Sequence, residues 1–192
     1  MTNDELKVIL EQHKLWLTCN NEGVPAKLRG VDLRGVDLSG ANLESANLMG
    51  ANLMGANLRG ADLSSANLEG ANLEDAILMR ANLWRAYLSG VNLSGADLSG
   101  ADLYVANLMG ANLRGANLEK TYLKNADLRY ADLEGAALRD ATLRGAKLRG
   151  VNLWGANLKN ADLRGADFEG VDFEGANLDN VYLENAERCI DF

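Results

Sequence analysis

A five-residue repeat constrains the fold of this chain more than any other feature. Residues 26–185 divide into thirty-two consecutive pentapeptides with no insertion or deletion. The third residue is Leu in thirty units and Phe in the other two, and the first residue is Ala in twenty-five. The second residue is usually Asp or Asn and the fifth is usually Gly, whereas the fourth varies.

A period of five fits neither regular secondary structure. On an α-helix, five residues advance by about 500°, so the leucines would spiral around the axis without forming an apolar stripe. On a straight strand, an odd period sends successive leucines to opposite faces. Within one extended unit, however, the first and third residues share a face, and a fifth-position Gly permits a turn. The repeat therefore predicts coils with Ala and Leu inside, stacked about 4.8 Å apart.

Units such as ADLSG, ANLRG and VDFEG resemble the pentapeptide-repeat family over residues 26–185. The resemblance implies an all-β fold, a right-handed quadrilateral β-helix in which four units close one coil, giving about eight coils. Residues twenty apart in the sequence should then lie directly above one another. One such column contains four successive asparagines, which predicts a ladder of amide side chains: Asn52, Asn72, Asn92 and Asn112.

The chain is expected to have three parts: an N-terminal helical cap and lead-in (1–25), the β-helix (26–185) and a C-terminal tail (186–192). Thr2 and Glu5 have the spacing of a capping box, and residues 2–17 are predicted to form a helix. A solenoid needs covered ends, so this helix should cover the first coil. The side chains expected on its apolar face are Leu6, Ile9, Leu10, His13 and Leu17, with Trp16 beside them.

The C-terminal end of the rod is a candidate contact between two copies of the chain. The pattern fails at Arg188, and the short tail that follows could cover the last coil only in part. A homodimer would then form end to end through four apolar residues: Phe168, Phe173, Ile190 and Phe192. The alternative is a monomer whose own tail covers this end.

Composition and charge argue against several classes of partner. The net charge is -8, which predicts no binding to nucleic acid or to an anionic membrane. No apolar run is long enough to span a bilayer, and the N-terminus does not resemble a signal peptide. The two cysteines, Cys19 and Cys189, lie at opposite ends of the chain, which favours a cytoplasmic location.

Residues for catalysis are scarce, and the chain is not expected to be an enzyme. His13 is the only histidine, and its place on an apolar helix face is typical of a packing residue. The glycines recur every five residues as turn formers and match no phosphate-binding motif. Neither a metal site nor a cofactor site is predicted.

Two groups of outward-facing residues are candidate contact sites. Trp84 and Tyr104 fall in one column with Tyr122 and Val105 close by, which predicts either a partner surface or an aromatic ladder that stabilises the stack. The last coil, 166–185, has six acids and no base, above a coil with four bases and one acid. It is either an acidic binding tip or one side of four ion pairs: Lys147–Asp167, Arg149–Glu169, Lys159–Asp179 and Arg164–Glu184.

The expected function is that of a non-catalytic protein-interaction or scaffold rod whose partner the sequence does not identify. The alternative, implied by the resemblance, is a DNA mimic that binds DNA gyrase or topoisomerase, as quinolone-resistance members of the family do. Residues 26–185 have a net charge of -5, whereas duplex DNA of the same length, about 38 Å, carries about 22 charges. The repeat also lacks the loop insertions of that type.

Overall fold

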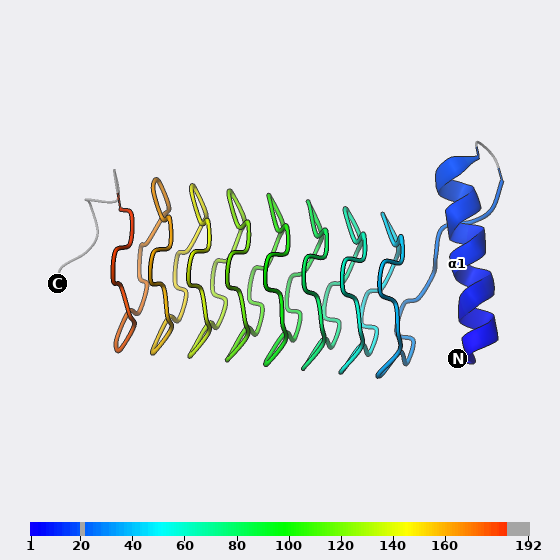
Figure 1. Ribbon diagram of the computed structural model, residues 1–192, viewed down its shortest axis with the longest axis horizontal. Coiled ribbons are helices and arrows are strands. Elements are labelled where there is room, and N and C mark those ends of the chain that lie inside the picture. Colours follow the sequence, from blue (N-terminus) through cyan, green and yellow to red (C-terminus); the bar gives the residue numbers. More distant parts are fainter. Residues whose placement is uncertain (20–21, 184–192) are drawn as a thin grey trace.

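The protein is a rod of stacked coils with a single helix lying across its N-terminal end. The computed structural model describes residues 1–19 and 22–183. Within these ranges the helix is α1 (Asn3–Thr18), and the remaining chain winds into the rod (Figure 1). The predicted tail, with Ile190 and Phe192, lies outside the described residues.

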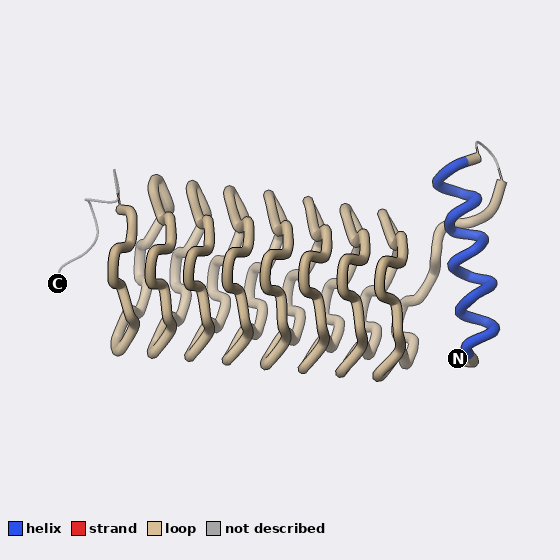
Figure 2. The backbone as a smooth tube through the Cα atoms, in the orientation of Figure 1, coloured by secondary structure: helices blue, strands red, loops and turns tan. Residues whose placement is uncertain are grey.

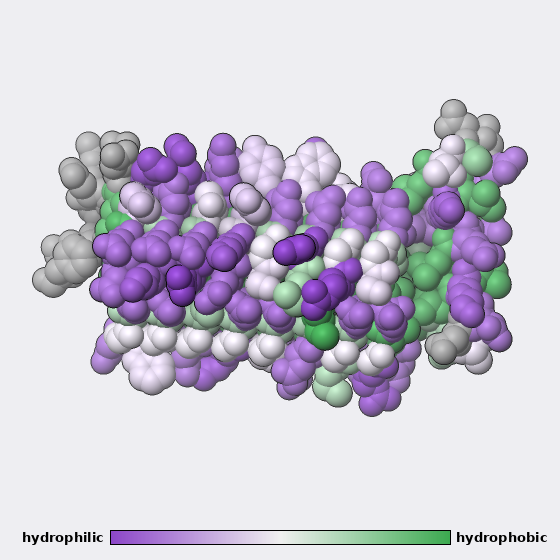
Figure 3. All heavy atoms as spheres, viewed as in Figure 1, coloured by the Kyte–Doolittle hydropathy of each residue, from purple (hydrophilic) through white to green (hydrophobic). Residues whose placement is uncertain are grey.

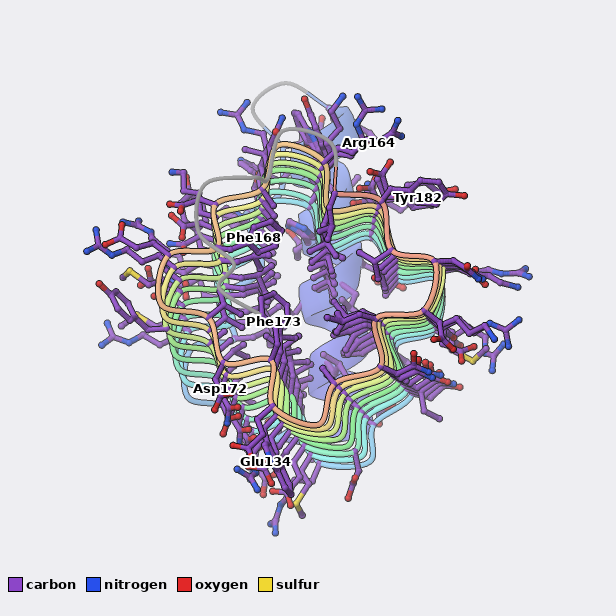
Figure 4. All side chains as sticks on the ribbon, turned by 90° about the vertical axis from the view of Figure 1, so that its left-hand side faces the viewer. Glu134, Arg164, Phe168, Asp172, Phe173 and Tyr182 are labelled. Carbon is purple, nitrogen blue, oxygen red and sulfur yellow. The ribbon has the colours of Figure 1, made fainter. Side chains whose placement is uncertain are left out.

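The coils are in register at twenty residues. Every β-bridge joins a second-position residue to the residue twenty later, in parallel, from Lys27–Asn47 to Asp162–Tyr182. Seen along its axis, the rod shows successive coils superimposed, with side chains pointing both inward and outward (Figure 4). The columns predicted from the sequence are therefore confirmed.

Each face of a coil contributes a single bridge and no longer strand. Tyr122 donates its N–H to the carbonyl of Ala101 (3.0 Å) and accepts from the N–H of Leu103 (2.9 Å). In the coil of Leu103 the chain turns directly after this bridge, and the turn is closed by Ala106 N–H, which donates to the Leu103 carbonyl at 3.0 Å. Because a corner follows every bridge, the described part of the rod is drawn entirely as loop (Figure 2). The solenoid is confirmed, whereas the expected all-β character is present only as isolated bridges.

The interior is a continuous column of Leu and Ala. Every Leu at the third position from Leu28 to Leu163 is buried, with at most 3% of its surface exposed. The second-position Asp and Asn face outward and brace the corners: Asp102 Oδ1, for example, accepts from the N–H of Tyr104 at 2.9 Å. The predicted amide ladder forms over three coils, since Asn112 donates to Asn92 and Asn92 to Asn72, both at 3.0 Å.

Helix α1 begins with the predicted capping box and covers the first coil. Thr2 Oγ1 accepts from the N–H of Glu5 at 3.2 Å, and Glu5 Oε2 accepts from the N–H of Thr2 at 2.8 Å. Leu6 and His13 are buried, and hydrophobic side chains gather where α1 meets the rod (Figure 3). The N-terminal end of the stack is therefore covered by the chain itself.

Candidate functional site

His13 is a packing residue of the cap. It is fully buried, its Nδ1 accepts from the N–H of Ala26 at 3.1 Å, and its ring stacks on Trp16 at a centroid distance of 5.5 Å. Burial lowers the pKa of His13, and the nearby backbone and carboxylate of Glu44 offset this only in part. The described residues contain no cluster of His, Cys, Asp and Glu that could hold a metal ion.

A small cavity of about 250 Å³ lies between the start of α1 and the first coil. Its charged groups satisfy each other: Arg34 Nη2 lies 2.6 Å from Asp32 Oδ2, and this pairing lowers the pKa of Asp32 to about 2. Both side chains are more than half exposed to solvent. Asp37 also lines the cavity, where its Oδ1 accepts from Ser39 N–H at 3.0 Å and from Asn57 Nδ2 at 3.0 Å. The polar groups of the cavity are thus engaged in contacts within the first coils.

The C-terminal end of the rod is open in the described residues. Phe168 is buried, Phe173 is half-buried, and their ring centroids are 5.9 Å apart. Both labels lie within the outline of the coils in Figure 4. Leu178 and Leu183, whose counterparts elsewhere are fully buried, are only partly buried here. The structure thus brings together two of the four residues predicted for an end-to-end contact.

The ion pairs predicted between the last two coils form only in part. Arg149 Nη2 lies 3.0 Å from Glu169 Oε1, as expected. Lys147 instead lies 3.5 Å from Asp127 in the coil below, and Arg164 lies 2.6 Å from Asp162 in its own unit. Lys159 forms no ion pair within the described ranges, and Glu184 lies outside them.

The outward aromatic residues predicted near the middle of the rod lie on adjacent coils. Trp84, Tyr104 and Tyr122 expose 39%, 36% and 58% of their surfaces, and Val105 exposes 42%. Backbone hydrogen bonds tie these coils directly together, from Arg85 N to Tyr104 O (3.0 Å) and from Leu103 N to Tyr122 O (2.9 Å). The four side chains therefore share one region of a rigid surface.

The predicted aromatic ladder does not form. Within the described residues the two ring pairs are His13–Trp16 and Phe168–Phe173, so Trp84 and Tyr104 do not stack. The guanidinium of Arg85 instead lies 5.1 Å from the centre of the Trp84 ring. The ring contact between Trp84 and Tyr104 that would stabilise the coils in the alternative interpretation is therefore absent.

Val105 stands in a backbone conformation that its side chain disfavours. Every described fifth-position residue has a positive φ, and nineteen of these residues are Gly. Val105 has φ 59° and is the only β-branched residue among the others, which are mostly Ser, Asp, Asn or long side chains. Left-handed backbone costs a residue with a Cβ roughly 1–2 kcal/mol, and branching at Cβ adds crowding. An exposed Val at this corner therefore reduces stability.

One further residue belongs to this region. Tyr87, which departs from the consensus of the repeat in the sequence, follows Trp84 around the next corner and exposes 51% of its surface. Sequence reasoning missed the strain at Val105, although the preference for Gly at the fifth position of the repeat was a signal that could have revealed it. We call these five residues the aromatic patch: Trp84, Tyr87, Tyr104, Val105 and Tyr122.

The register, the buried Ala and Leu, and the left-handed corners define a solenoid repeat protein built from five-residue units. A sequence profile described as pentapeptide repeats matches this chain in eight copies, over residues 26–64, 66–104, 106–145 and 146–185. The chain belongs to the pentapeptide-repeat family.

Several solved structures are similar to this chain. One is HetL from the cyanobacterium Nostoc sp. strain PCC 7120, a pentapeptide-repeat protein described as involved in heterocyst differentiation regulation. HetL is 26% identical to this chain, and the match covers 97% of this chain and 99% of that chain with a TM-score of 0.45. The pentapeptide-repeat protein alr5209 from Nostoc is 46% identical over 50% of this chain and 83% of that chain, with a TM-score of 0.46.

QnrB1, a plasmid-mediated fluoroquinolone resistance protein, is 22% identical; the match covers 82% of this chain and 91% of that chain, with a TM-score of 0.51. This likeness shows a shared fold. Comparison with curated protein sequences gives no significant match. None of the helical residues described in the structure forms a segment long and apolar enough to cross a membrane.

Proposed function

We propose that this right-handed β-helix is a non-catalytic interaction rod that holds a protein partner against the aromatic patch, in the cytoplasm. The observation that carries the proposal is the exposed Val105, which is held in left-handed backbone between exposed aromatic rings. Strained residues persist where surrounding structure enforces them, and they concentrate at functional sites.

The composition of the patch suits a protein interface. Trp and Tyr anchor protein interfaces because they bury a large area and lose little conformational entropy. The rod holds them rigidly, because each coil is hydrogen-bonded to its neighbours on every face. A partner would therefore meet a pre-organised surface, which lowers the entropic cost of binding.

The proposal is tested by capture from a lysate of the source organism with Trp84→Ala/Tyr104→Ser as bait. The matched control is Tyr130→Ser/Trp154→Ala, which removes two aromatics, both more exposed than Trp84 and Tyr104, from other corners of the rod. We expect at least one protein to be captured by the wild type and the control but not by the patch variant. Identical sets of captured proteins for all three baits would contradict the proposal.

The gyrase-binding alternative receives less support from the charges. Residues 26–185 carry sixteen bases and twenty-one acids, far from the uniform negative charge of duplex DNA. A supercoiling assay separates the two functions. We expect no inhibition of gyrase at micromolar protein, and inhibition that survives Trp84→Ala/Tyr104→Ser would favour the DNA mimic.

A further inference from the structure

One face of the rod is positively charged although the chain as a whole is acidic. Two corners and the face between them, in three consecutive coils, form what we call the basic face: residues 119–125, 139–145 and 159–165. These segments contain six bases and three acids, in a chain whose net charge is -8. Bridges from Tyr122 to Thr142 and from Thr142 to Asp162 hold the three segments in register.

One edge of the basic face is a column of like charges. Lys124, Arg144 and Arg164 lie above one another, because Asn125 N donates to Arg144 O (2.9 Å) and Gly145 N donates to Arg164 O (3.0 Å). Like charges directly opposite each other on neighbouring strands are destabilising. Opposite charges stack in other columns, as with Arg149 and Glu169 at 3.0 Å, although Arg129 also lies one coil below Arg149. The column therefore does not serve the stability of the stack.

The acids on this face neutralise only part of its charge. Asp162 lies 2.6 Å from Arg164 and 4.0 Å from Arg144, and Asp140 lies 3.4 Å from Arg139. The lysines of the face form no ion pair with any residue in the described ranges: Lys120, Lys124 and Lys159. Three cations on two coil corners are thus available to an incoming acid.

The basic column continues the column of the aromatic patch. Trp84, Tyr104, Lys124, Arg144 and Arg164 are each twenty residues apart, so they form one straight line along the rod. Four coil spacings of about 4.8 Å give a line of about 19 Å, which an extended peptide spans with about six residues. We infer that the partner presents an extended acidic segment, whose apolar end contacts the aromatic patch and whose carboxylates lie along the basic face. This inference rests on the proposed function.

An acidic peptide fits this line better than a nucleic acid does. Glu119, Asp140 and Asp162 interrupt the positive charge, and the acidic remainder of the rod repels a longer polyanion. A short peptide can place its carboxylates between these acids and its apolar side chains on the aromatic patch. A nucleic acid would instead carry a phosphate at every step.

The test uses labelled synthetic peptides of about ten residues, in which two Phe precede or follow a run of Glu. Matched probes carry Gln in place of Glu, and oligothymidylate serves as the nucleic-acid probe. The variant is Lys124→Glu/Arg144→Glu, and the control is Lys27→Glu/Arg29→Glu, which makes the same charge change on another face of the first coil. Binding is measured by fluorescence anisotropy at low and high salt.

We expect an acidic peptide to bind the wild type and the control, with an affinity that falls as salt rises. The Lys124→Glu/Arg144→Glu variant should bind about tenfold more weakly, as expected for reversing two charges at an interface. The inference is overturned by equal binding of the Gln probe, by equal loss in the control, by tighter binding of oligothymidylate, or by no peptide binding. A lysate partner lost in Trp84→Ala/Tyr104→Ser but retained in Lys124→Glu/Arg144→Glu would refute only this inference and leave the proposed function standing.

Discussion

At the scale of single residues, the corners of the rod depend on left-handed backbone. Glycine fills most of these corners because it has no Cβ to clash with the neighbouring carbonyl. Asn and Asp also tolerate this conformation, and Asn125 stands directly above Val105 with φ 57°. The cost of a β-branched side chain at such a corner can therefore be measured twice, by removing the branch at Val105 and by introducing one at Asn125.

Val105→Asn should stabilise the rod by about 1 kcal/mol, because it relieves the left-handed strain without adding a flexible Gly to the unfolded chain. The urea midpoint of unfolding measures this change. The reverse substitution at the next coil, Asn125→Val, should lower the midpoint by a similar amount. An unchanged or lower midpoint for Val105→Asn would show that Val105 carries no strain.

At the scale of elements, the junction between α1 and the first coil depends on a neutral imidazole. His13 Nδ1 can accept from Ala26 N–H only while that nitrogen carries no proton. Burial holds the pKa of His13 below its ordinary value, against the opposing influence of Glu44. Glu44 is the charged group of the rod that acts on His13, and a protonated His13 would lose the hydrogen bond from Ala26.

The attachment of α1 should therefore weaken as pH falls. A group with a lowered pKa in the folded state contributes its full stability above its unfolded pKa, about 6.5 for His, and loses that contribution as pH drops. Hydrogen exchange of α1 amides, corrected for intrinsic rates, should be faster at about pH 5 than at pH 7. His13→Asn keeps an acceptor that cannot be protonated, so exchange that still depended on pH in this variant would assign the effect to other groups.

The coil register could be predicted from the sequence because thirty-two units share one pattern, and the pattern places Leu and Ala inside wherever the chain turns. The capping box of α1 could also be predicted, because it depends only on residues that are close together in the sequence. The choice of ion-pair partners could not be predicted: Lys147 lies 3.5 Å from Asp127 in the coil below, because its long, flexible side chain can reach a carboxylate in either neighbouring coil. Nor could the missing contact between Trp84 and Tyr104 be predicted, since column spacing fixes Cα positions and leaves ring orientation free.

At the scale of the whole molecule, the two ends of the rod differ. The N-terminal end is covered by α1, whereas the last described coil leaves Phe173, Leu178 and Leu183 only partly buried. We propose that two copies meet at this end, since apolar core residues left open would otherwise contact water.

Light scattering should then give a mass twice the 20.7 kDa of one chain. Phe173→Asp should return the mass to that of one chain, because a carboxylate at the contact would be buried without a partner. Phe173→Leu serves as the control and should leave the dimer intact. A wild-type mass of one chain at all concentrations would contradict the dimer and favour a monomer whose own tail covers the end.

The exact register of twenty residues also limits how this molecule can change in length. Duplicating or losing one complete coil lengthens or shortens the rod and leaves every column in place. Adding or losing a single pentapeptide still allows every coil to close, yet it rotates all later side chains by one face. A lost unit between Val105 and Lys124 would turn the aromatic and basic surfaces to different sides, so insertions and deletions that preserve the fold could still abolish recognition.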